Sequence, residues 1–151
     1  MEKIKTTIAT LSLLLTATAH ASCFIMGDSI AYGISTQAPA CQSNAKVGLN
    51  TKDALTRFSV VPAVDTTIIS LGVNDRNSSL PTVHNLEAIR SRVKASKVVW
   101  ILPTSYELVK RKQVAQVAAA HGDKTLNVDA LIGADHIHPT NYFEIARELR
   151  L

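Results

Sequence analysis

The stretch Phe24-Ile25-Met26-Gly27-Asp28-Ser29-Ile30 puts a serine where a short apolar run ends in a glycine turn. An apolar run of this kind is typical of a buried strand, and Gly27 is the residue that ends it. A serine that follows a buried strand through a sharp turn is exposed at the end of a sheet, which is a common position for a nucleophile. Gly-Asp-Ser also occurs in ordinary turns, in which Asp28 would act as a cap. The interpretation therefore depends on the rest of the chain.

Three further motifs follow downstream. Gly48 stands in a loop, Gly72-Val73-Asn74-Asp75 comes directly after an apolar run, and Asp135-His136-Ile137-His138-Pro139 lies near the end of the chain. Each motif lies at the predicted end of a strand or the predicted start of a helix. Because the carboxyl ends of parallel strands meet at one edge of a sheet, we expect these residues to come together there.

Strands and helices are predicted to alternate along the chain. Short apolar or β-branched runs without polar alternation predict buried parallel strands at residues 23–26, 66–71, 97–102 and 125–128, with a weaker fifth at 45–47. Apolar residues at three- and four-residue spacing predict helices at residues 51–58, 83–93, 107–120 and 141–149. The alternation predicts an α/β fold, a three-layer α/β/α sandwich with a mainly parallel sheet of about five strands.

The motifs, in the order serine, glycine, asparagine and then aspartate with histidine, resemble those of the SGNH hydrolases, also called the GDSL esterase and lipase family. The resemblance covers residues 23–150. It implies a flavodoxin-like sandwich and the hydrolysis of ester bonds by a serine nucleophile, with no cofactor. The chain is short for this family, and the loops that would form the substrate cleft are small, which predicts an open, shallow cleft without a lid.

The resemblance also implies a role for each motif residue. Ser29 is the nucleophile, His138 is the base that takes its proton, and Asp135 is the carboxylate that orients the imidazole. The spacing of three residues puts Asp135 and His138 on one side of a turn. The oxyanion formed during the reaction would be bound by the backbone N–H of Ser29, the N–H of Gly48 and the side-chain amide of Asn74.

Other interpretations of these residues stay open. Residues 72–75 could be a strand-ending turn in which Asn74 tolerates left-handed geometry. Asp135, His136 and His138 could form a metal site, but nothing else in the sequence supplies a clear third or fourth ligand, so we predict no metal. Gly33 is an alternative to Gly48, although it lies too close to Ser29 in the sequence to come from another strand.

The first residues have the pattern of a secretory signal peptide. Two lysines form a basic start, residues 8–19 are mostly apolar, and Ala19-His20-Ala21 is a small-x-small cleavage site. An apolar segment of about a dozen residues is shorter than the roughly 20 that a membrane-spanning helix needs. We therefore predict a signal peptide at residues 1–21 and an exported hydrolase domain at residues 22–151, periplasmic or secreted, with no stable membrane insertion after cleavage.

Cys23 and Cys41 are the two cysteines of the chain. In an oxidising compartment a pair of cysteines more often forms a disulfide than stays free. The bridge would close a loop of about 18 residues and stabilise the fold by about 3 kcal/mol. Two free thiols are the alternative. Because Ala21-Ser22-Cys23 looks like the end of a lipobox, a lipid anchor on Cys23 is a further, minor alternative.

The charge distribution does not favour nucleic acid as a partner. The chain has 16 Lys and Arg residues against 12 Asp and Glu residues, a formal net charge of +4. The basic residues are scattered, apart from Lys110-Arg111-Lys112, which lies in a predicted helix with few aromatic residues nearby. This cluster predicts a solvated helix face. A weakly basic surface is compatible with an anionic envelope polymer.

Taken together, these features predict an exported serine esterase that removes short acyl groups, such as acetyl, from an envelope or extracellular carbohydrate. The expected partner is therefore a small ester or an acylated carbohydrate. A lipolytic esterase, lysophospholipase or thioesterase that acts on lipid chains is the alternative. A non-catalytic carbohydrate-binding module on the same fold ranks lower, because Ser29, Asp135 and His138 are all present.

Overall fold

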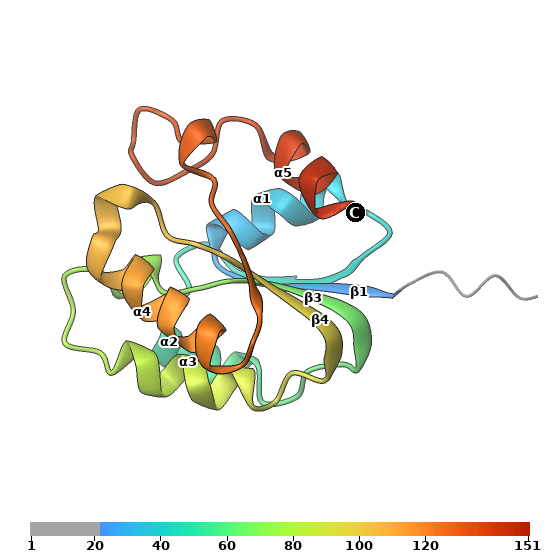
Figure 1. Ribbon diagram of the computed structural model, residues 1–151, viewed down its shortest axis with the longest axis horizontal. Helices are drawn as coiled ribbons and strands as arrows, with labels where there is room; N and C mark the ends of the chain where they lie inside the picture. The colour runs from blue at the N-terminus through green and yellow to red at the C-terminus, as the bar shows by residue number, and fades with distance from the viewer. Residues whose placement is uncertain (1–21) are drawn as a thin grey trace, which may run out of the picture.

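In a computed structural model that describes residues 22–151, a parallel sheet forms the middle layer (Figure 1). The strands lie in the order β2-β1-β3-β4-β5, and every neighbouring pair is parallel. The predicted signal peptide lies outside the described residues. The strand bounds are β1 Cys23–Gly27, β2 Gln42–Ala45, β3 Val64–Ser70, β4 Ala95–Ile101 and β5 Lys124–Leu126.

Helices cover both faces of the sheet, so the predicted three-layer α/β/α sandwich is confirmed. The helices α1 and α5 pack together on one face, and α2, α3 and α4 pack together on the other (Figure 1). Short 3-10 turns follow β3, β4 and β5 at Val73–Asp75, Ser105–Glu107 and Asp129–Leu131. Among residues 22–151, no helix is both long enough and apolar enough to cross a membrane. The helix bounds are α1 Ser29–Gln37, α2 Thr51–Arg57, α3 Thr82–Arg90, α4 Leu108–Ala120 and α5 Tyr142–Leu149.

The central strands are buried on both sides, which explains their continuous apolar runs. In β3, Ile68 belongs to the apolar cluster under α1 and α5, and Ile69 belongs to the cluster under α2, α3 and α4. In β4, Val99 likewise belongs to the cluster under α1 and α5, and Trp100 belongs to the cluster under α2, α3 and α4. Successive side chains of a strand point to opposite faces. Two separate apolar layers therefore hold the sheet between its helices.

The edge strands and the first helix differ from the sequence prediction. β2 spans Gln42–Ala45 rather than 45–47, and β5 spans Lys124–Leu126 rather than 125–128, because both lie at sheet edges where exposed polar residues carry no apolar signal. No helix was predicted for α1, since its sequence contains glycine, serine and threonine, which are weak helix formers. Its helical signal is confined to the buried Ile30 and Ile34.

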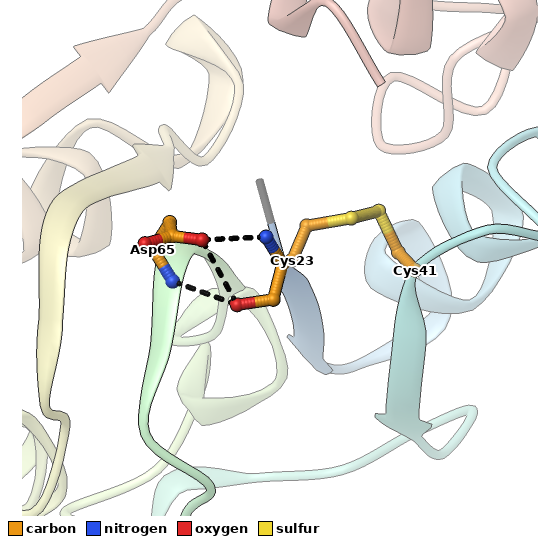
Figure 2. Close-up of a disulfide and its surroundings, with 4 residues drawn as sticks. Cys23, Cys41 and Asp65 are labelled. Atoms are coloured by element: carbon orange, nitrogen blue, oxygen red, sulfur yellow. Dashed lines mark hydrogen bonds between the residues drawn. A yellow bond between two sulfur atoms is a disulfide. The ribbon is translucent and has the colours of Figure 1, made fainter. Parts of the chain in front are cut away.

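The predicted disulfide is present and joins Cys23 at the start of β1 to Cys41 just before β2. Figure 2 shows the bridge on one side of the start of β1 and Asp65 on the other. The Asp65 carboxylate accepts hydrogen bonds from the backbone N–H of Ser22, at 2.6 Å, and from the Ser22 hydroxyl, at 3.1 Å. The Ser22 carbonyl in turn accepts from the N–H of Asp65 and of Thr66. The start of β1 is therefore attached to both of its neighbouring strands.

Replacing both cysteines, Cys23→Ser with Cys41→Ser, should lower the free energy of unfolding by about 3 kcal/mol, because the bridge closes a loop across a separation of 18 residues. Urea unfolding of both proteins measures the difference. The wild-type protein in a reducing agent should behave like the variant, and the variant itself should not respond to the reducing agent. Equal stability of the oxidised and reduced wild-type protein would contradict the prediction.

Candidate active site

The site residues lie at the carboxyl edge of the sheet, where the strand order changes direction. From β1 the chain crosses to β2 on one side, and β3 then pairs with β1 on the other side. In open parallel sheets, such a switch point leaves a crevice beyond the strand ends in which ligands bind. Ser29 follows β1 and Asn74 follows β3, so the two predicted site residues flank this switch point.

A close contact between β1 and β3 determines where Ser29 stands. Gly27 has a φ of 138°, and a Cβ built on it would lie 1.9 Å from the carbonyl oxygen of Ser70, so only glycine fits. The N–H of Asp28 donates to that carbonyl at 2.9 Å, and the Ser70 hydroxyl donates to Asp28 Oδ1 at 2.9 Å. Asp28 Oδ1 also accepts from the N–H of Ile30 and caps α1. The helix therefore begins at Ser29.

Ser29 and His138 are joined across 109 residues of sequence. Ser29 Oγ lies 2.9 Å from His138 Nε2, and His138 Nδ1 lies 2.6 Å from Asp135 Oδ2. A carboxylate can only accept, so in the neutral imidazole the proton lies on Nδ1 and Nε2 is free to accept from the Ser29 hydroxyl. The structure thus brings the three predicted catalytic residues into one hydrogen-bonded chain.

Asp135 is held by its own loop. Its Oδ1 accepts from the backbone N–H groups of Ile137, at 2.9 Å, and of His138, at 2.8 Å. These backbone bonds, with the side-chain bond from His138, hold the pKa of Asp135 well below its usual range. The carboxylate is therefore ionised at any pH near neutrality. Pro139 pairs with Ile132 in an isolated antiparallel bridge, which closes the loop behind these residues.

The site is open to solvent. The side chains of His138 and Asp135 are 42% and 52% exposed, and Ser29 is partly exposed. A cavity of about 560 Å³ lies elsewhere, between α5 and residues 127–131, and neither Ser29 nor His138 lines it. An exposed site admits an ester that is attached to a large molecule.

The two other predicted oxyanion donors come from neighbouring loops. Asn74 lies in the turn after β3, and its amide nitrogen donates to the carbonyl of Leu49 at 3.1 Å. That bond ties the turn to the loop that carries Gly48, which has a φ of 75° and open space where a Cβ would be. Gly33, the alternative glycine, lies within α1 against the ring of Tyr142, where a Cβ would have no room. Its role is helix packing.

A buried polar network behind Asn74 went unpredicted. The carboxylate of Asp75 accepts from the N–H of Thr51, at 2.8 Å, and from the hydroxyls of Thr51, at 2.5 Å, and Thr82, at 2.7 Å. Thr82 also accepts from the ammonium group of Lys110, at 3.0 Å. Thr51 and Thr82 begin α2 and α3, and Lys110 lies on α4. Asp75 therefore ties the turn that carries Asn74 to three helices.

The sequence prediction for Lys110 was wrong. Lys110 is buried rather than solvated, because its ammonium group completes the Asp75 network. A second contact between charged side chains joins His121 to Glu87, with His121 Nε2 2.6 Å from Glu87 Oε2. Neither contact has a local sequence signal, because each joins two different helices. Within residues 22–151, no group of three or more His, Cys, Asp or Glu side chains is arranged to hold a metal ion.

Comparison with known structures identifies the fold. A carbohydrate acetylesterase from Sinorhizobium meliloti matches with a TM-score of 0.57 and 14% identity, over 87% of this chain and 99% of that one. An aryl esterase from M. smegmatis matches with a TM-score of 0.56 and 13% identity, over 86% and 99%. The chain has the SGNH hydrolase fold.

A further structural match is named for peptidoglycan. The catalytic domain of peptidoglycan O-acetyltransferase A from Streptococcus pneumoniae matches with a TM-score of 0.50 and 16% identity, over 84% of this chain and 87% of that domain. No family model and no curated protein matches the sequence. At these identities the structural matches establish the fold alone.

Asp28, beside Ser29, is a fully buried carboxyl group. No donor among the described residues reaches its Oδ2. Burial raises the pKa of Asp28 to about 6, against the opposing effect of the bonds from Ser70 and Ile30. In an unfolded chain the pKa is about 3.9, so the folded protein favours the protonated form. The stability that this form contributes is complete below pH ~4 and is lost as the pH rises through about 6.

Asp28→Asn should therefore gain stability relative to the wild type as the pH rises from about 4 to 6, by up to roughly 3 kcal/mol, since an amide keeps the acceptor oxygen but does not ionise. Urea unfolding of both proteins at pH 4, 5, 6 and 7 measures the difference. Asp53→Asn, at an exposed carboxylate, is the control. A difference between Asp28→Asn and the wild type that stays constant over this range would show that Asp28 does not titrate there.

Proposed function

We propose that this chain is an exported serine esterase that removes short acyl groups, acetyl foremost, from carbohydrate. One observation carries the proposal. The hydroxyl of Ser29, the imidazole of His138 and the carboxylate of Asp135 form a continuous hydrogen-bonded chain with separations of 2.9 and 2.6 Å. This arrangement has the components of a serine hydrolase triad, namely a nucleophile, a base and a group that orients the base.

The first half of the reaction transfers the acyl group to the enzyme. Ser29 Oγ attacks the ester carbonyl carbon while its proton passes to His138 Nε2, and Asp135 stabilises the imidazolium that forms. The tetrahedral intermediate collapses when the carbon–oxygen bond to the alcohol breaks. The leaving alkoxide takes the proton from His138 Nε2. The products of this half are the free alcohol and an acyl ester on Ser29.

The second half returns the enzyme to its starting state. A water molecule gives a proton to His138 Nε2 and attacks the acyl carbon. Breaking the bond to Ser29 Oγ releases the carboxylic acid, and the proton on His138 returns to the serine. The open site gives water direct access to the acyl group.

The negative charge on the carbonyl oxygen needs donors. Ser29 begins α1, and the first N–H groups of a helix have no acceptor within the helix. Its N–H is therefore available at a helix end that favours negative charge. The N–H of Gly48 and the amide of Asn74 are the second and third donors in this proposal. The bond from Asn74 to the Leu49 carbonyl uses one of the two amide hydrogens, which leaves the other for the oxyanion.

The open site and two structural matches support a carbohydrate ester as substrate. The acetylesterase from Sinorhizobium meliloti is named for carbohydrate, and the Streptococcus pneumoniae domain for peptidoglycan. A long acyl chain would need a deep apolar channel, whereas the predicted catalytic residues here are exposed. Hydrolysis rates over nitrophenyl esters from acetate to palmitate test this choice. A maximum at palmitate would favour the alternative of a lipolytic esterase.

The disulfide supports export. Bridges form and persist in oxidising compartments and are rare in the cytosol. Ser22 is the residue after the proposed cleavage site and is already held by Asp65, so a chain cleaved there would keep its first strand in place. Mass spectrometry of the protein purified from the periplasm or the medium tests whether the mature chain begins at Ser22.

Ser29→Ala should abolish ester hydrolysis and labelling by a fluorophosphonate probe, because only the nucleophilic oxygen is removed. His138→Ala should lower kcat by at least about a thousandfold. His121→Ala is the matched control, since that histidine pairs with Glu87 away from Ser29. The measurements are acetate release, probe labelling and melting temperature. Labelling at a different serine, or normal turnover by Ser29→Ala, would remove the proposed nucleophile.

Asn74→Ala should lower kcat by about a hundred- to a thousandfold with little change in KM, because an oxyanion donor acts only when charge develops on the carbonyl oxygen. Asn74→Asp should be at least as harmful, since it puts a negative charge beside the oxyanion. Measuring kcat with melting temperature separates this effect from the loss of the bond to Leu49. If Asn74→Gly keeps a near-normal kcat, Asn74 serves the turn alone.

A further inference from the structure

Two exposed aromatic rings, one of them in the predicted catalytic loop, lie in contact with each other. The ring centroids of Tyr106 and His136 are 4.2 Å apart, with an angle of 37° between the ring planes. Tyr106 is 66% exposed, and His136 is also exposed. The rings come from different segments, the 3-10 turn after β4 and the loop after β5. The pair therefore presents aromatic surface to solvent.

The backbone of His136 has a conformation that favours glycine. Its φ is 62°, in the left-handed region, which costs a residue with a Cβ conformational free energy. The conformation follows from the loop, because the N–H of His136 donates to the carbonyl of Gly133 at 3.0 Å and Gly133 in turn donates to the carbonyl of His138. A histidine held in this costly conformation indicates a role for its ring.

One buried hydroxyl fixes both members of the pair. Thr104 is completely buried, and its Oγ1 donates to the carbonyl of His136 at 2.9 Å. The same oxygen accepts from the N–H of Tyr106 at 3.2 Å. The N–H of the intervening Ser105 donates to Asp129. The two rings are therefore held on rigid backbone, so a ligand that lies on them pays little ordering cost.

The chemistry of the proposed reaction determines which part of a substrate meets this pair. His138 Nε2 must give its proton to the leaving oxygen, so the alcohol part of the ester lies beside His138. His136 is two residues away in the same closed loop. The carbonyl oxygen points toward the proposed oxyanion donors instead. The loop that carries His136 and His138 therefore borders the leaving alcohol, and the ring of Tyr106 contacts that loop.

We propose that Tyr106 and His136 form the subsite that binds a sugar ring of the leaving alcohol. This inference rests on the proposed function. The C–H face of a pyranose ring is apolar and its rim carries hydroxyl groups, which matches an aromatic face with a polar tip. An exposed platform, in contrast to a closed pocket, can hold one ring of a continuing polysaccharide. The pair therefore selects carbohydrate esters over small esters that lack a sugar.

Direct binding tests the subsite without catalysis. Calorimetry of xylotetraose and of chitotetraose with the Ser29→Ala protein should show binding of at least one of them, and adding Tyr106→Ala or His136→Gly should weaken that binding about tenfold. Glycine adopts the left-handed conformation readily, so His136→Gly removes the ring and keeps the loop. Tyr106→Phe should retain most of the binding. Val60→Ala, at an exposed residue that precedes β3 at the opposite end of the sheet, is the control.

Selectivity in turnover is the second measurement. The ratio of kcat/KM for O-acetylated xylotetraose to kcat/KM for nitrophenyl acetate should fall about tenfold in Tyr106→Ala and in His136→Gly, with melting temperatures near that of the wild type. Unchanged ratios, or no binding of either tetrasaccharide, would overturn the subsite while leaving the esterase intact. Tyr32 is an exposed residue of α1. A fall of the ratio in Tyr32→Ala, but not in Tyr106→Ala, would overturn the subsite by placing the sugar against α1. A wild-type protein that is not labelled at Ser29 by the fluorophosphonate probe would instead refute the proposed function. The binding experiment does not depend on turnover, so it would still decide whether the subsite exists.

Discussion

The contact between Gly27 of β1 and Ser70 of β3 is the constraint on which the site depends. A Cβ on Gly27 would force the two central strands apart, because the Ser70 carbonyl fills that space. The same carbonyl accepts from Asp28, and the Ser70 hydroxyl reaches the Asp28 side chain that caps α1. The sheet therefore determines where the helix α1 begins, and with it the position of Ser29. A side chain at Gly27 would displace Ser29 without touching it.

Two carboxyl groups near Ser29 show how environment separates similar side chains. Asp28 is buried with few donors, and burial raises its pKa to about 6. Asp135 is exposed, but backbone N–H groups of its own loop hold its pKa well below its usual range. Desolvation disfavours the charged form, and hydrogen bonds to that form favour it. The residue that orients His138 therefore stays charged, and the residue that caps the helix can stay neutral without losing its structural bonds.

The buried network of Asp75 is the counterpart of these bonds on the other side of the site. Its carboxylate and the ammonium group of Lys110 never touch directly, since the hydroxyl of Thr82 bridges them. Removing one partner from such a network leaves an uncompensated buried charge, which is strongly destabilising. The network consequently fixes the turn that carries Asn74 against the starts of α2 and α3. This fixed position suits a group that must meet a developing charge at a defined place.

Features set by neighbouring residues were determined by the sequence alone. The glycine turn before Ser29, the buried central strands, and the spacing that lets Asp135 bond to Ile137 and His138 are all local, so they can be recognised without a fold. The Cys23–Cys41 bridge was predictable because the predicted export would put the two cysteines of the chain in an oxidising compartment. The exact bounds of the edge strands β2 and β5 were not predictable, since their exposed polar residues pair with the sheet through backbone hydrogen bonds alone.

Only the tertiary structure decided the features that join distant segments. The bond between Ser29 and His138 spans 109 residues, and the burial of Lys110 depends on Thr82 in another helix. The pairing of Tyr106 with His136 requires two loops to be brought together by Thr104. Such contacts produce no local sequence pattern, because the two residues are far apart in the chain and meet only when the sheet has formed.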